Sequence, residues 1–314
     1  MTLPGLSAQQ LNIETIQHGG VSWINIQQPG VAEMQYLKER FHFHQLTLDD
    51  CLSVVQMPKL DQFEDHIFLV LHVPRFNKES RITMPSEVDV FAGSSYVITV
   101  HDGNLRPLTK LFQDCQSSEA LRDALMGQGS GFLLYRVLDT LVDYCFPILN
   151  KVIDNVNMVE EQVFETWNQN VVREMARLRH DILSYRRIVR PQIEVLEAME
   201  ARRFPFLRLN PDIYFGDLAD HMRRIWSELE DLKEVIEGLY DSQGSLTNLH
   251  TNDITRALTG VATLLFPFLM VSGIYGMNVT LPFAGQWWAF WFVILVSLGL
   301  SIGLWILLKL ERWL

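Results

Sequence analysis

Charge is missing from the last part of this chain. Residues 257–308 contain no Asp, Glu, Lys or Arg, so all 63 charged side chains fall in the other 262 positions. Proton relays and ion-coupled sites inside a membrane usually depend on ionisable side chains, and the uncharged stretch provides none. The remainder of the chain has the composition of an ordinary, somewhat acidic soluble protein.

Several functional signatures are also missing. The net charge is −11 and no basic stripe occurs, so nucleic acid is excluded as an expected partner. The three cysteines form no CxxC or Cys/His pattern, and we expect them to be reduced side chains of a cytosolic domain. The sequence has no glycine-rich phosphate loop, nucleophile elbow or HExxH motif, so we do not expect an enzyme. The N-terminus lacks a basic segment followed by an apolar one, and we expect no cleaved signal peptide.

Two apolar runs occupy most of the uncharged region. Leu258–Tyr275 and Trp287–Leu308 are each close to the roughly 20 apolar residues that a helix needs to cross the hydrocarbon core. The short loop between them is uncharged, so the two runs are predicted to form a hairpin in the membrane. Arg256 before the first run and Lys309 after the second indicate that both termini are cytoplasmic. We therefore expect a multi-pass protein of the cytoplasmic (inner) membrane, in contact with lipid.

In the part of the chain that precedes the apolar runs, the spacing of the apolar residues changes once. The beginning of this part mixes β-branched or aromatic runs with helical ones, whereas later apolar residues recur three and four apart, as in amphipathic helices. Strands are predicted at 21–27, 66–76, 87–93 and 95–101, and a helix at 31–41. The predicted segments are 1–125, a cytoplasmic α/β domain; 126–210, cytoplasmic helical arms; 211–275, a stalk helix and first transmembrane span; 276–286, an outer loop; 287–308, the second span; and 309–314, a cytoplasmic tail. The fold class is an α+β membrane protein.

The stalk helix is predicted to be unusually long. Pro211 suits a helix start, and no proline follows it until Pro267. Read as one helix over 211–275, this segment would extend roughly 100 Å at 1.5 Å per residue. One chain cannot bury such a helix, so we expect an oligomer built around it.

One face of this helix is a candidate pore lining. Steps of three and four residues give the row Asn252, Thr255, Thr259, Ala262, Phe266, Leu269 and Gly273, with Leu258 as an alternative to Thr259. The row begins polar, becomes bulky and apolar, and ends small. Around an axis, its polar part could carry a hydrated ion and its apolar rings could form a dewetting gate. The alternative is that Phe266 and Leu269 simply pack against neighbouring helices.

A family resemblance rests on the end of this helix. The segment "TNDITRALTGVATLLFPFLMVSGIYGMN", followed by a second span and a short basic tail, resembles the CorA family of divalent-cation channels. The segments "FHFHQLTLDD" and "QFEDHIFLVLH" are similar to that family's N-terminal domain, so the resemblance covers nearly the whole chain. It implies a homopentamer that passively carries Mg²⁺, and also Co²⁺ or Ni²⁺, with no organic cofactor.

The resemblance also implies roles for particular residues. Gly276, Met277 and Asn278 would form the outer mouth, where a ring of Asn278 amide oxygens could hydrogen-bond to the water shell that Mg²⁺ releases reluctantly. Cytoplasmic Mg²⁺ would act as a regulator at Asp217, which would face Asn77 of a neighbouring chain.

Three matching positions depart from the family pattern. Phe266 and Leu269 stand where a methionine and a threonine are common, which predicts a pore that is harder to wet. Asn77 stands where an acid is expected, which predicts weaker binding of the regulatory metal. Two other functions stay open. One is a Zn²⁺ transporter of the ZntB branch, which shares the architecture, although Met277 rather than valine favours Mg²⁺. The other is a membrane-anchored sensor that conducts nothing.

Overall fold

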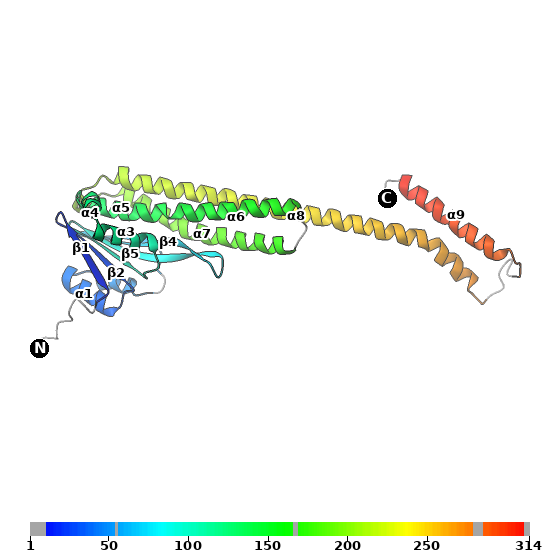
Figure 1. Cartoon of the computed structure of the whole chain (residues 1–314), viewed down its shortest axis with the longest axis horizontal. Helices are drawn as coiled ribbons and strands as arrows, with labels where there is room; N and C mark the ends of the chain where they lie inside the picture. Colours follow the sequence, from blue (N-terminus) through cyan, green and yellow to red (C-terminus); the bar gives the residue numbers. More distant parts are fainter. Residues whose placement is uncertain (1–10, 54–55, 166–168, 279–284, 311–314) are drawn as a thin grey trace. The chain divides into compact units, whose positions relative to one another are not determined.

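The computed structural model describes residues 11–53, 56–165, 169–278 and 285–310 (Figure 1). The chain divides into two compact units, Met1–Leu239 and Tyr240–Leu314, and each is described by itself. The first unit combines a β-sheet with helices, and the second is helical.

The first unit contains one six-stranded sheet with the order β1-β2-β6-β5-β4-β3. Neighbouring strands are antiparallel except for β2 and β6, which are parallel. The strands are β1 (Ile13–His18), β2 (Val21–Gln27), β3 (Lys59–Gln62), β4 (His66–Asn77), β5 (Ile82–Gly93) and β6 (Tyr96–His101). Both edge strands are short or partly exposed, which limits edge-to-edge pairing with other chains.

The two faces of the sheet carry different helices. Helices α1 (Val31–Phe41) and α2 (Gln45–Asp50) contribute Leu37 and Leu48 to a core cluster with Phe91 of β5. On the other side, Trp23 packs edge-on against Phe112 with ring centroids 5.0 Å apart. The helices that follow β6 are α3 (Arg106–Ser117), α4 (Glu119–Met126), α5 (Ser130–Asp143), α6 (Cys145–Glu165) and α7 (Gln169–Ala201).

Helix α7 is fixed to both the sheet and α6 by polar contacts. The Ser184 hydroxyl donates to the carbonyl of Thr83 in β5 at 2.7 Å, and Asp181 accepts from the Thr83 backbone N–H. The Tyr185 hydroxyl donates to the Cys145 carbonyl of α6 at 2.7 Å. These bonds satisfy polar groups that would otherwise be buried without a partner.

A short 3₁₀ turn, η2 (Pro205–Leu207), precedes α8 (Pro211–Tyr275). Within the first unit the ring of Phe146 in α6 lies 5.8 Å from that of His221 in α8, and ion pairs such as Arg223–Glu197 at 3.7 Å join α8 to α7. Its buried residues are three and four apart, as in a coiled coil: Phe215, Leu218, Met222, Ile225, Leu229, Leu232, Ile236 and Leu239. This stripe ends at the boundary between the two units.

The structure bears out the long helices and most of the predicted strands. Strand β2 and helix α1 have the expected bounds, and α8 is a single helix over 211–275. Strand β5 begins five residues earlier than the predicted 87–93, because Pro85 lies opposite Pro74 of β4 instead of ending the strand. Strands β1 and β3 were not predicted. All three cysteines are buried and free, as expected.

Candidate functional site

The second unit consists of the last part of α8 and helix α9 (Ala289–Leu310). Both helices are long and apolar enough to cross a membrane, with mean hydropathies of 1.9 and 2.4 over their most apolar windows. Helix α9 begins and ends two residues later than the predicted span 287–308. Of the predicted tail, Lys309 and Leu310 belong to α9, and 311–314 lie outside the described residues.

One face of α8 packs against α9. The Ser301 hydroxyl of α9 donates to the Leu264 carbonyl of α8 at 2.8 Å, and Gly260 and Pro267, about one turn before and after Leu264, are buried. Pro267 has no N–H and removes one helical hydrogen bond from this turn. The carbonyl that Pro267 leaves without its helical partner is that of Thr263, so the Ser301 bond to Leu264 is an additional link between α8 and α9 next to this turn.

The predicted pore row lies on a different face of α8. At about 100° per residue, its members point away from the face that α9 covers. All seven are exposed in the single chain: Asn252, Thr255, Thr259, Ala262, Phe266, Leu269 and Gly273. Phe266 and Leu269 are 60% and 69% exposed, so neither packs inside its own chain. The row is therefore free to face other copies of the chain, a lumen or lipid.

Threonine hydroxyls in this part of α8 are arranged as acceptors. The Thr255 hydroxyl donates to the Thr251 carbonyl at 2.8 Å, and Thr251 donates in the same way to Thr247. Because the proton is used within the helix, the lone pairs of the Thr255 oxygen are directed outward. An oxygen in that state can accept hydrogen bonds from the water of a hydrated cation.

The predicted outer mouth coincides with the end of α8. The Gly276 N–H donates to the Ser272 carbonyl at 2.9 Å, and the Met277 N–H donates to the Ile274 carbonyl at 3.3 Å. A Cβ at Gly276 would lie 3.1 Å from the Ser272 oxygen, a tight contact that glycine avoids. Asn278 follows at once and is exposed. The rest of the predicted loop, 279–284, lies outside the described residues.

The two predicted regulatory residues are placed separately. Asp217 lies on α8 with its side chain 51% exposed and its carboxylate 3.9 Å from Nε2 of His221. Asn77 ends β4, where its side-chain oxygen accepts from the Glu79 N–H at 2.9 Å and closes a turn. Facing of the two between neighbouring chains stays a prediction.

The structure adds two acids of α5 to the surroundings of Asp217. Burial raises the pKa of Asp139, and the charges of Asp143 and then Asp217 raise it further, while Arg136 lowers it. The spacing of Asp139 and Asp143, four residues apart on one helix face, is the signal in the sequence that could have found them. In the described part of the chain, no three His, Cys, Asp or Glu side chains are grouped closely enough to hold a bare metal ion.

Known proteins resemble this chain over most of its length. It is 29% identical to the YfjQ protein of Bacillus subtilis (strain 168), over 97% of this chain and 94% of that one. It is 27% identical to the cobalt/magnesium transport protein CorA of Thermotoga maritima, over 93% and 83%. A zinc transport protein, ZntB of Yersinia pseudotuberculosis, is 22% identical over 93% and 88%.

A solved structure shares the fold. The complete CorA magnesium transporter from Methanocaldococcus jannaschii matches with a TM-score of 0.81 and 22% identity, covering 94% of this chain and 92% of that one. Both proteins share a sheet-containing unit, a long helix and two C-terminal apolar helices. Residues 18–310 match the family described as CorA-like Mg²⁺ transporter protein, and the chain belongs to that family.

Proposed function

We propose that the chain is a passive channel that carries Mg²⁺, and also Co²⁺ or Ni²⁺, into the cytoplasm. The observation that carries this proposal is the exposed Asn278, which follows Gly276 and Met277 at the end of α8. The proposed orientation has both termini in the cytoplasm, so Asn278 stands at the outer face. A cation-transport protein named CorA among the relatives supports the choice of ions.

In this mechanism the ion enters with its water shell. Neutral amide oxygens of Asn278 accept hydrogen bonds from that water without stripping it, which suits an ion that loses water reluctantly. Inside-negative potential then drives uptake, with about 4.6 kcal/mol for a divalent ion per 100 mV. Farther along, outward oxygens such as that of Thr255 receive the hydrated ion.

The two apolar positions of the row would form the gate. Phe266 and Leu269 are large, apolar and exposed, and rings of such side chains close a pore by excluding water. Opening would require α8 helices to separate or rotate. We infer that cytoplasmic Mg²⁺ opposes this by binding at Asp217, with Asp139 and Asp143 nearby.

A zinc transporter is the second candidate function. It is supported by the likeness to ZntB, which extends over most of both chains. Met277 in place of valine favours Mg²⁺, whereas the pore row does not decide between the ions, because the proposed contacts are made through water. Uptake of Mg²⁺, Co²⁺, Ni²⁺ and Zn²⁺ into liposomes containing the purified protein separates the two functions. A protein that carries none of them would be the non-conducting sensor.

The first prediction concerns Asn278. Asn278→Ala should abolish or severely reduce divalent uptake, because the amide is exposed and its loss removes the ion contact with little effect on folding. Asn278→Asp should bind cations more tightly and discriminate less, since several carboxylates would meet and some would be protonated by mutual repulsion. The measurement is Mg²⁺ uptake by liposomes, with assembly checked by size-exclusion chromatography. Normal uptake by assembled Asn278→Ala would show that the motif only ends the helix.

A further inference from the structure

A polar cavity of about 280 Å³ lies in the first unit, beside the end of α2. Its polar side chains come from the end of α2 and the residues directly after it, from strands β4, β5 and β6, and from the residue that follows β6. The side chains that matter are Cys51, Ser53, His72, Glu87, Asp89 and Asp102. None of them belongs to the pore row or to the acids around Asp217.

Asp89 is the unusual member of this lining. It is only 3% exposed, and its Oδ1 has no hydrogen-bond partner. The neighbouring Cys51 thiol donates to the Thr47 carbonyl at 3.3 Å, so its proton is already used. A buried carboxyl oxygen without a partner is costly and rare. A ligand in the cavity would provide the missing partner.

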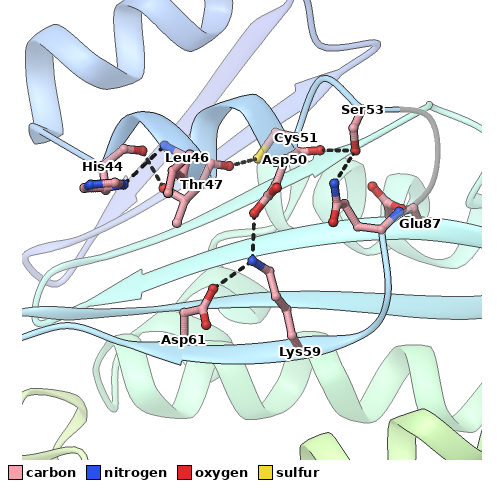
Figure 2. Close-up of polar contacts among 10 residues, drawn as sticks. His44, Leu46, Thr47, Asp50, Cys51, Ser53, Lys59, Asp61 and Glu87 are labelled. Carbon is pink, nitrogen blue, oxygen red and sulfur yellow. Dashed lines mark hydrogen bonds and ion pairs between the residues drawn. The ribbon is translucent and has the colours of Figure 1, made fainter.

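The charged groups around Asp89 are mostly negative. Glu87 lies two residues earlier on the same face of β5, and Asp50 lies on α2. Lys59 of β3 is already bound by Asp50 at 2.7 Å and Asp61 at 2.9 Å (Figure 2). On β4, Nε2 of His72 is 3.5 Å from Oε2 of Glu87.

This environment acts on the protonation of Asp89. Burial, and then the charge of Glu87, raises the pKa of Asp89 to about 8. Without a ligand, Asp89 is therefore mostly neutral at pH 7. A cation in the cavity would reverse both effects, because it offsets the neighbouring negative charge and favours the ionised form.

We propose that this cavity binds a hydrated divalent cation through the carboxylates of Asp89 and Glu87. Mg²⁺ usually keeps several waters and uses only one or two carboxylates, so a closed cage of three or more ligands is not needed. Six waters occupy roughly 180 Å³ at about 30 Å³ each, which the cavity can accommodate. The remaining waters can donate to Asp102 and Ser53. The site is independent of whether the chain conducts ions.

Binding is coupled to a proton. The neutral Asp89 carboxyl releases its proton to the solvent, and the resulting carboxylate binds the hydrated cation. Affinity should therefore rise with pH up to about pH 8 and level off above it. Ions in the pore row release no proton by this route, because none of the seven side chains of the row carries an ionisable group.

The test is titration calorimetry of the full chain in detergent micelles with MgCl₂ at pH 7. Two buffers with different ionisation enthalpies give the number of protons released. The wild-type chain should release close to one proton per occupied site. Asp89→Asn should lose this release, and Glu87→Gln should weaken the proton-linked binding at least tenfold while the sheet remains folded by circular dichroism. Asp217→Asn, the control for the other acidic site, should keep the release.

Each outcome bears on the proposal. Loss of proton release in Asp89→Asn together with its retention in Asp217→Asn would support it. An Asp89→Asn variant that binds as many Mg²⁺ ions per chain as the wild type, with the same affinity, would overturn it. Failure of Asn278→Ala to affect uptake would contradict the proposed transport mechanism and leave this site unaffected.

Discussion

The carboxylate of Asp217 is half exposed on α8 and shares its surroundings with Asp139 of α5. Asp139 is itself paired with Arg136 at 2.6 Å, which reduces the negative charge that the proposed site offers to a divalent cation. Asn77, proposed to face it from a neighbouring chain, contributes a neutral oxygen that is already bonded to the Glu79 N–H. We therefore expect regulation by internal Mg²⁺ through this site to be present but weak.

Asp217→Lys tests that expectation. The ammonium group would place a fixed positive charge where the metal is proposed to bind, so it should mimic the bound ion. The variant should resist protease even without Mg²⁺, so adding Mg²⁺ should increase its resistance much less than in the wild type. Ion flux through the variant should also respond less to internal Mg²⁺. Limited proteolysis and liposome flux measure the two effects.

The matched control is Asp220→Lys, which makes the same charge change on α8 at a more exposed position, 74% against 51%. It should behave like the wild-type protein. If Asp217→Lys also leaves flux and protection unchanged, the regulatory site lies elsewhere or does not exist.

Among the contacts between secondary-structure elements, one hydrogen bond from a serine hydroxyl joins α8 and α9. Ser301 donates to the Leu264 carbonyl beside Pro267, whereas Ser297 of the same helix donates to Val293 within α9. Both serines are almost fully buried, at 5% and 2% exposure. They therefore differ in whether their hydrogen bond joins the two helices or stays inside one.

Ser301→Ala should destabilise the helix pair by about 0.5–1.5 kcal/mol, the range of hydrogen bonds between membrane helices. Ser297→Ala should have a smaller effect, because its hydroxyl bonds only to its own helix. The measurement is thermal unfolding in detergent, compared among the wild type and both variants. Equal losses of stability would mean that the Ser301 bond does not hold the helices together.

The elements also show what the sequence could and could not predict. The long helix α8 carries a clear period of three to four, because one face of its first part is buried. Strand β2 is buried on both faces and was recognised from its β-branched and aromatic residues instead. Strands β1 and β3 lie at the sheet edges, where exposed polar residues obscure the alternation. The end of α8 could be predicted because the residues of its motif, Gly276, Met277 and Asn278, are consecutive in the sequence. The Asp89 cavity could not, since it joins residues from α2 and three strands that only the fold brings together.

At the scale of the whole molecule, the single chain leaves a long apolar surface uncovered. Ile225, Leu232 and Leu239 are buried at intervals of seven residues along α8, but Leu246, the next in the series, is 40% exposed. Leu249 is 62% exposed as well. Both leucines precede the uncharged stretch 257–308, so contact with lipid does not explain why these apolar side chains are exposed. A coiled-coil pattern that continues without a partner in its own chain predicts a partner from another chain.

We therefore expect a homo-oligomer, and propose five subunits around the α8 helices. Leu249→Asp should weaken assembly, because a carboxylate at an apolar helix contact must be desolvated or left unpaired. The control is Asn248→Asp, which adds the same charge at the neighbouring exposed position and should leave assembly intact if that position faces solvent. Light scattering in mild detergent gives the mass of each variant, and uptake into liposomes should fall with the oligomer in Leu249→Asp. A wild-type chain that is a stable monomer in mild detergent would contradict the pentamer. It would also leave the pore row without the axis that the proposed channel requires.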